Sequence, residues 1–280
     1  MIEVIFLFLL GFIWMSFAVI QDLKTKEIAN WLNFSLIIFA IGFRFFYSLF
    51  SGNGFEFFYQ GLMGLGIFFL IGNLLYYGKM FAGGDAKLMI ALGAVLPLSE
   101  NFFLNLAFFL TFIMIFLLVG AGYSFLTTLV LSIQNHHKFK KEFFVRFKRH
   151  KKAILLILPV AIALLATGFF VNVLILYLGI LVFVMPYIYL YTKSVDEACM
   201  VRQISTSRLT EGDWLYKNVK AGGKTIKAEW SGLSKEDVRL LKKKHKTVLI
   251  RYGIPFSPVF LISFIIIFWL YSTKLWGFLF

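Results

Sequence analysis

Two aspartates are the residues best placed to do chemistry in this chain. Asp22 closes the first apolar segment, and Asp85 follows two glycines in the stretch 82–87, AGGDAK. An acid at a membrane boundary is costly and usually serves a function. Two neighbouring carboxyl groups do not easily ionise together, so one keeps a proton while the other accepts one from water. Such a pair is suited to peptide hydrolysis by general acid–base catalysis, without a covalent intermediate.

Each aspartate also has a simpler interpretation. Asp22 is then an interfacial anion beside Lys24, and Asp85 is a loop acid paired with Lys87. The residues alone leave these interpretations open beside the catalytic pair.

Other kinds of catalytic or metal chemistry have little support in the sequence. Cys199 is the only cysteine, which excludes a disulfide within the chain and a zinc site built on cysteines. The four histidines fall in basic stretches that we expect to be solvated loops. No P-loop, GxSxG or HExxH motif occurs. We therefore expect no cofactor and no bound metal.

Composition and charge pattern predict an all-α membrane protein. Hydrophobic residues make up 60% of the 280 positions, and the mean hydropathy is +0.83. A spanning helix needs roughly 20 apolar residues, and we expect about eight transmembrane helices and a small α+β cytosolic segment before the last one. The predicted spans are 4–21, 31–50, 57–77, 86–98, 102–133, 153–171, 173–192 and 254–273. The first seven form a membrane core over 1–192. Arg44 interrupts the second span, and we expect its side chain to extend to the interface.

The distribution of basic residues predicts the topology. With the short segment 86–98 counted as a span and both termini outside, every Lys and Arg except Arg44 and Lys274 falls on the cytosolic side. This asymmetry is what the positive-inside rule requires. It places Asp22 and Asp85 near the same cytosolic face.

The shortness of segment 86–98 has a consequence for Asp85. Thirteen helical residues cover only about 20 Å of a core roughly 30 Å thick. Either the bilayer is thinned here, or the backbone enters the membrane before Asp85, where Gly83 and Gly84 would allow an unwound entry. Irregular backbone at that depth requires protein or a water-filled cavity around it, so Asp85 is predicted to face a wet cavity.

Residues 193–253 form the only long polar segment. Residues 213–229 read as short strands around a glycine turn at 221–224. Ser234 and Asp237 indicate a capping box, followed by a helix with Val238, Leu240 and Leu241 as apolar contacts. The lysine-rich run 242–246 favours solvation or anionic lipid headgroups over nucleic acid.

The surroundings of the two aspartates resemble a known family. The stretch 82–87 is similar to the GxGDxK signature of intramembrane aspartyl proteases of the prepilin and preflagellin peptidase type. The stretch 22–30, DLKTKEIAN, resembles the family's other motif, an Asp at the end of the first span followed by a basic turn. The likeness is closest over residues 1–135. Ala82 stands where the family has the first glycine of its signature.

The resemblance implies an aspartic endopeptidase with Asp22 and Asp85 as its catalytic dyad. Type IV pilin-like or flagellin-like precursors are the implied substrates, cleaved at the cytosolic face after a short basic leader. Gly83 and Gly84 would let the backbone approach closely, and Lys87 would tune the charge of Asp85 or orient the entry loop. Asn30 is expected to cap the second span.

The cysteine content narrows the comparison within the family. Many bacterial relatives carry a cysteine-rich cytosolic insertion and methylate the new N-terminus, whereas this chain has Cys199 alone. We expect no methyltransferase activity and a closer likeness to archaeal members.

Two other functions remain alternatives at this stage. A proton- or ion-coupled transporter would use the same acids as ion sites, although polar residues in the spans are few. A membrane scaffold would bind a partner through the basic 193–253 segment.

Overall fold

The computed structural model describes residues 2–52 and 54–273, so Lys274 lies outside the described residues. The chain divides into two compact units. The first unit contains residues up to Ser124 together with the chain from Ile254 onward, and the second runs from Phe125 to Gly253. The boundary between them falls inside the long helix α5.

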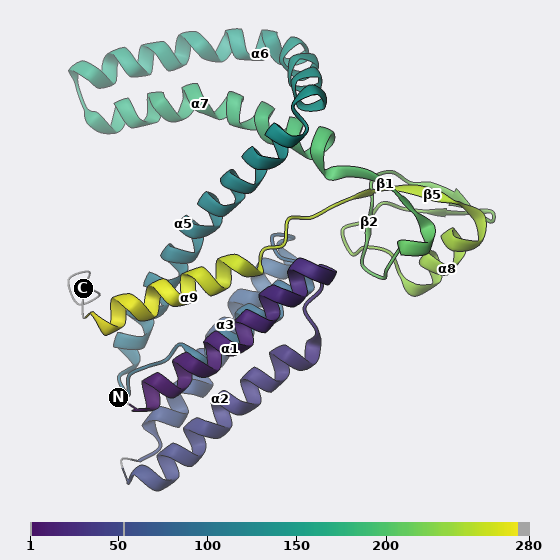
Figure 1. The fold of residues 1–280 in the computed structure, drawn as a ribbon. Coiled ribbons are helices and arrows are strands. Elements are labelled where there is room, and N and C mark those ends of the chain that lie inside the picture. Colours follow the sequence, from purple (N-terminus) through teal and green to yellow (C-terminus); the bar gives the residue numbers. More distant parts are fainter. Residues whose placement is uncertain (1, 53, 274–280) are drawn as a thin grey trace. The chain divides into compact units, whose positions relative to one another are not determined.

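The first unit is a bundle of helices. Its members are α1 (Ile2–Thr25), α2 (Asn30–Ser51), α3 (Glu56–Tyr77), α4 (Gly83–Val95), the first part of α5 (Phe102–Gln134) and α9 (Ser257–Ser272). Helices α1 and α2 form an antiparallel pair, and α9 lies along α1 (Figure 1).

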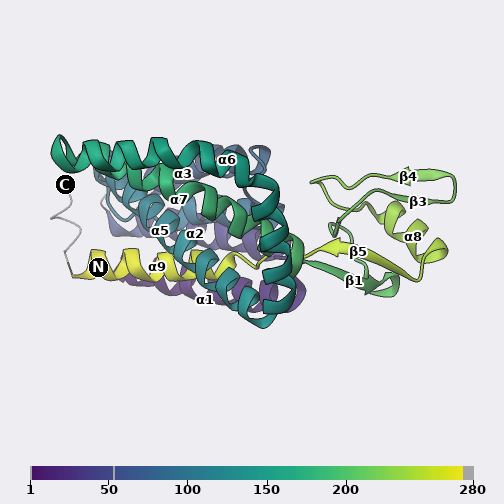
Figure 2. The ribbon, with the colours of Figure 1, turned by 90° about the horizontal axis from the view of Figure 1, so that it is seen from above.

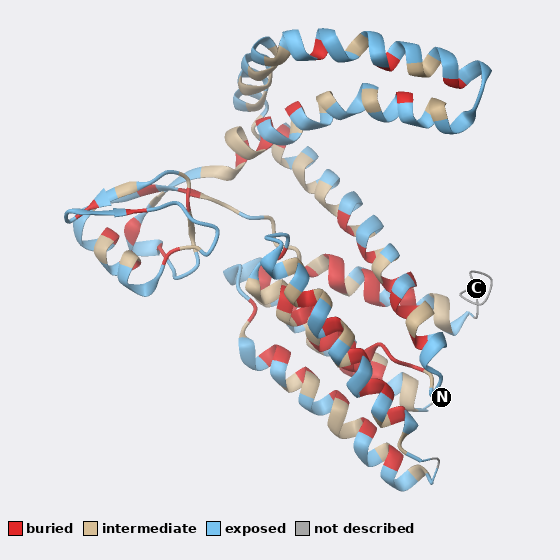
Figure 3. Ribbon diagram, turned by 180° about the vertical axis from the view of Figure 1, so that it is seen from behind, coloured by how far each residue is buried: buried red, intermediate tan, exposed pale blue. Residues whose placement is uncertain are grey.

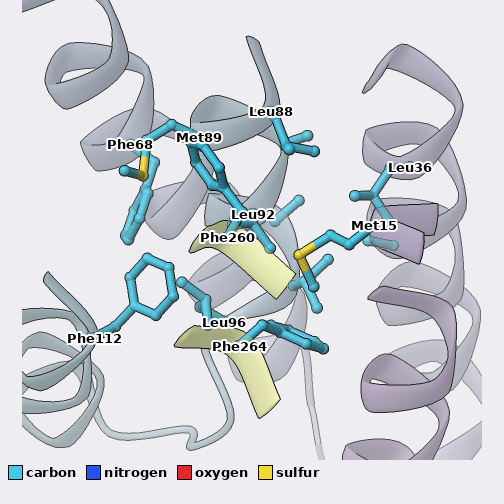
Figure 4. Close-up of a cluster of buried hydrophobic side chains, with 14 of the residues drawn as sticks. Met15, Leu36, Phe68, Leu88, Met89, Leu92, Leu96, Phe112, Phe260 and Phe264 are labelled. Atoms are coloured by element: carbon cyan, nitrogen blue, oxygen red, sulfur yellow. The ribbon is translucent and has the colours of Figure 1, made fainter. Parts of the chain in front are cut away.

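Helix α4 is the buried centre of this bundle. Eight of its 13 residues are buried, and it contacts α1, α2 and α3. Figure 4 shows its side chains Leu88, Met89 and Leu92 converging with residues of the surrounding helices. The other labelled residues are Met15, Leu36, Phe68, Leu96, Phe112, Phe260 and Phe264. A helix that is apolar all round is typical of such a central position.

Glycines bring α3 and α4 into direct backbone contact. A Cβ atom added at Gly93 would lie 2.5 Å from the carbonyl oxygen of Gly64, and one added at Gly72 would lie 2.9 Å from the carbonyl oxygen of Ala86. Larger residues at these positions would force the helices apart. Small residues that let backbones approach are the usual packing device of membrane helices.

Arg44 is fully buried, and our expectation that it extends to the interface is wrong. Its guanidinium donates hydrogen bonds to the carbonyl oxygens of Ala94 (2.8 Å), Val95 (3.2 Å) and Pro97 around the end of α4, and to that of Phe57 (3.0 Å). The absence of a side chain at Gly61 leaves room for it. The last carbonyls of a helix have no partner within it, so Arg44 supplies the donors that these carbonyls would otherwise take from water.

We expect Arg44→Met to destabilise the protein by about 3 kcal/mol, because each buried carbonyl left without a donor costs about 1–3 kcal/mol. The thermal unfolding midpoint in detergent measures this. Arg239→Met, at an exposed position of the polar segment, is the matched control and should leave the midpoint nearly unchanged. Equal midpoints for the two variants would contradict the role given to Arg44.

Six of the described helices are long and apolar enough to cross a membrane, which indicates a multi-pass membrane protein. They are α1, α2, α3, α5, α6 (His136–Phe170) and α7 (Val173–Val195, which continues to Met200). Helices α4 and α9 are shorter, with 13 and 16 residues. The predicted total of eight spans is therefore not established.

The second unit contains the α6–α7 hairpin and the polar segment. Helices α6 and α7 pack along each other, and most of their residues are exposed (Figure 3). Residues 136–152, which we expected in a loop, form the first half of α6. His136, His137 and His150 therefore lie on a helix, and only His245 follows one.

The polar segment folds as a small α+β structure. Its elements are a π-helical turn (Asp196–Met200), β1 (Val201–Ser205), a 3-10 turn (Thr206–Arg208), β2 (Trp214–Leu215), β3 (Val219–Ala221), β4 (Lys224–Ile226), α8 (Lys235–Lys244) and β5 (Thr247–Arg251). One antiparallel sheet has the order β1-β5-β2, and β3 and β4 form a separate hairpin (Figure 2).

Local signals in this segment are confirmed. Gly222 and Gly223 form the hairpin turn with φ of 59° and 84°, values that favour glycine. Ser234 and Asp237 form the predicted capping box at the start of α8. The hydrogen bond from the Ser234 hydroxyl contributes most to a lowered pKa of Asp237. Val238 and Leu241 are buried, and Leu240 packs against the same core.

Candidate active site

Asp22 lies in the last turn of α1 and is only 6% exposed. Its Oδ2 accepts a hydrogen bond of 3.2 Å from the backbone N–H of Ser257, the first residue of α9. The free N–H groups at a helix start favour a negative charge. The start of α9 therefore holds one oxygen of the buried carboxyl group in place.

Asp85 is the third residue of α4 and is partly exposed. Its carboxyl group interacts with the backbone amide of Ala82, the residue before the helix. The expected unwound entry at Gly83 and Gly84 is wrong, because α4 begins at Gly83. The irregular backbone lies earlier, where Lys79 adopts a φ of 59°.

The fold brings the two acids together from 63 positions apart in the sequence. The charge of Asp22 acts directly on the carboxyl group of Asp85, so the two groups lie within electrostatic reach. Among the described residues, neither Asp22 with Lys24 nor Asp85 with Lys87 forms an ion pair. The simpler interpretation of each acid as a lysine partner therefore has no support in the described part of the chain.

The connection between α1 and α2 packs against the start of α4. A Cβ atom added at Gly84 would lie 3.3 Å from Cβ of Ile28, which is buried. The connection is itself held by a 3.0 Å hydrogen bond from the Ala29 N–H to Oε1 of Gln21. Gly84 thus sets how closely the segment after Asp22 approaches the segment that carries Asp85.

Residues before α4 are fixed by aromatic packing. Phe81 is buried, and its ring centre lies 5.8 Å from that of Phe116, 6.0 Å from that of Phe256 and 5.9 Å from that of Phe260. Phe256 directly precedes Ser257, so the segments leading to Asp85 and to the donor of Asp22 touch each other.

The resemblance noted in the sequence implies a peptidase, and on that basis we expect Gly84→Ala to lower cleavage activity roughly tenfold. The added methyl group would displace Ile28 by a few tenths of an ångström, and small displacements at an active site are costly. Gly83→Ala is the matched control, since its Cβ atom would meet only Tyr76, at 3.8 Å. Cleavage of a pilin-like precursor measures both. A larger loss for Gly83→Ala would contradict the proposed contact.

Lys87 connects α4 to α2. Its Nζ donates a 2.7 Å hydrogen bond to Oδ1 of Asn30. The expected capping role of Asn30 is wrong, because Ala29 precedes the helix and no side chain caps it. Asn30 instead binds the helix that carries Asp85.

Two polar residues near these elements were missed by the sequence analysis. Ser257 donates to Asp22, and the only signal was a Ser-Pro pair at the start of the last apolar run. Asn33 lies one turn after Asn30 on α2 and is 1% exposed, and its side-chain amide makes no hydrogen bond among the described residues. The only signal was its polar side chain between Leu32 and Phe34 in the predicted span 31–50.

Ser257→Ala should keep cleavage activity within about twofold, because the donor to Asp22 is the backbone N–H, which alanine retains. The buried hydroxyl of Ser257 has no partner in the described part of the chain, so stability should change by less than about 1 kcal/mol. Precursor cleavage and the unfolding midpoint test this. A loss of activity comparable to that of an aspartate variant would show that the hydroxyl, not the backbone, serves the site.

The described residues contain no group of three or more His, Cys, Asp or Glu that could hold a metal ion. What the site offers is two carboxyl groups that interact, one bound by a helix start and the other partly exposed. This arrangement can hold a water molecule and exchange protons with it.

A family comparison agrees with this arrangement. Residues 9–130 match the type IV leader peptidase family. The matched region includes both aspartates and the segments that carry them. Type IV leader peptidases act on pilin-like precursors. No curated protein and no solved structure matches the chain.

Proposed function

We propose that this protein is a membrane aspartyl endopeptidase that removes the short basic leader from type IV pilin-like precursors. The observation that carries the proposal is the electrostatic interaction of Asp22 with Asp85, two acids 63 positions apart. Both lie in the region that matches the type IV leader peptidase family.

In the proposed reaction the two carboxyl groups share one proton and bind a water molecule. The ionised carboxylate takes a proton from water as the oxygen attacks the scissile carbonyl carbon. The protonated partner hydrogen-bonds the carbonyl oxygen, and the leaving amine receives a proton as the C–N bond breaks. The hydrogen bond from the Ser257 N–H holds one oxygen of Asp22 in place during these steps.

Neighbouring residues fix the positions of the two carboxyl groups. Gly84 allows the close approach of Ile28, and Gly83 begins the helix that carries Asp85. Lys87 fixes that helix to α2 through Asn30. Ala82 stands where the family has the first glycine of its signature. Its methyl group is tolerated, because the residue is exposed and its backbone is extended.

The charge pattern supports a site at the cytosolic face. Basic residues flank both aspartates, with Lys24 and Lys26 after Asp22 and Lys79 and Lys87 around Asp85. Under the positive-inside rule these segments are cytosolic, which is where a leader ahead of a hydrophobic helix would remain. We further propose cleavage without methyl transfer and an archaeal origin.

Asp22→Asn and Asp85→Asn should each reduce cleavage of a co-expressed pilin-like precursor at least about 1000-fold, because an amide cannot exchange the proton. Glu27→Gln is the matched control, an exposed acid five residues after Asp22. Membrane extraction and unfolding midpoints establish that each variant is folded. Cleavage at the wild-type rate by either folded aspartate variant would refute the dyad.

A further inference from the structure

Two tryptophans form a stacked pair on the polar segment. The ring centres of Trp214 and Trp230 lie 4.5 Å apart at an interplanar angle of 29°. Trp230 is 43% exposed, although it is among the largest apolar side chains of this segment. The buried core of the segment is formed by other residues, so this pair is not needed to fill it.

The pair lies at one particular end of the three-stranded sheet. Trp214 in β2 is paired with Arg251 in β5, and Arg251 is paired with Val201 in β1. The chain enters the sheet at Val201 directly after α7, and it leaves at Arg251 toward the apolar helix α9. Both connections to membrane helices therefore leave from the end that carries Trp214.

Ion pairs connect this end of the sheet, and the turn that precedes it, to the end of α7 and to α6. Arg251 Nε lies 3.2 Å from Oδ1 of Asp196, at the end of α7. Glu197 lies 3.7 Å from the guanidinium of Arg146 on α6. Lys152 is the last charged residue before the apolar part of α6. Arg146 lies six residues before Lys152, which is about 9 Å along a helix. The headgroup region is about 5–8 Å thick on each side of the hydrocarbon core. With the apolar run of α6 in the membrane, we expect this sheet end close to the headgroups.

Cations accompany the aromatic rings at this end. Arg202 lies over the ring of Tyr252, and Arg251 and Lys217 lie near the ring of Tyr216, with distances to the ring centres of 5.5, 5.7 and 5.0 Å. Trp and Tyr concentrate at membrane–water interfaces, and basic residues there attract anionic headgroups.

We propose that Trp214 and Trp230 insert into the headgroup layer of the bilayer and anchor the polar segment to the membrane surface. The partner is the lipid interface, with the exposed Arg202 and Lys217 facing lipid phosphates. This anchoring is independent of the catalytic assignment of Asp22 and Asp85.

The test places a nitroxide label at position 230 of the full chain in lipid nanodiscs. Cys199 is replaced by alanine, and Trp230→Cys supplies the labelling site. Lys246→Cys is the matched control, an exposed residue five positions before Arg251 and thus about 16 Å along the strand from the proposed membrane end. Collision rates with oxygen, which concentrates in lipid, and with a water-soluble nickel chelate give the depth of each label.

We expect the oxygen-to-nickel collision ratio at position 230 to exceed that at position 246 several-fold. Equal, water-like ratios would overturn the proposal. A label at position 230 that neither reagent reaches would also overturn it, because the pair would then be covered by protein.

A second measurement keeps the native tryptophan in place. The fluorescence lost on changing Trp230→Phe is the contribution of Trp230, and brominated lipids in the nanodisc should quench that contribution by at least about half. If brominated lipids leave the contribution of Trp230 unquenched, the proposal is overturned.

Discussion

The hydrogen bonds from Arg44 to the end of α4 are the constraint on which the first unit depends. A helix of 13 residues inside an apolar bundle ends where water does not reach it, so its last carbonyls need donors from the protein. Arg44 brings these donors from α2 and packs its guanidinium 4.3 Å from the ring centre of Phe57. The helix α2 also holds the other end of α4, through the hydrogen bond between Asn30 and Lys87. Contacts with α2 therefore fix both the depth and the rotation of α4, which carries Asp85.

Backbone contacts also help to place the two acids. Asp22 is held by a main-chain N–H of α9, and Asp85 is brought near through a glycine that packs on Ile28. Glycines also let the backbone of α3 touch that of α4. Positions fixed in this way tolerate few changes of side-chain size, since the contacts contain no flexible atoms that can adjust.

The predictable parts of this fold were those that depend on local sequence. Long uncharged runs indicated the apolar helices, and the capping box at Ser234 and the glycine turn at Gly222 were found because their signals lie within a few residues. The roles of Arg44, Ser257 and Asn30 were missed or misassigned, because each depends on a partner between 50 and 235 positions away. The sheet of β1 and β5 was missed for the same reason, since its strands pair across the intervening α8 and hairpin. The two aspartates were predicted to lie at a similar depth, and that remains a prediction. Their electrostatic interaction could be seen only in the folded chain.

The distance along the chain between Asp22 and its donor has a consequence for biosynthesis. Ser257 is made 235 residues after Asp22, so a chain still emerging from the ribosome carries both acids long before the N–H that holds one of them. During this interval the buried carboxyl group lacks its backbone partner, and the pair is incomplete. The pair of carboxyl groups is therefore complete only late in synthesis, when α9 packs beside α1.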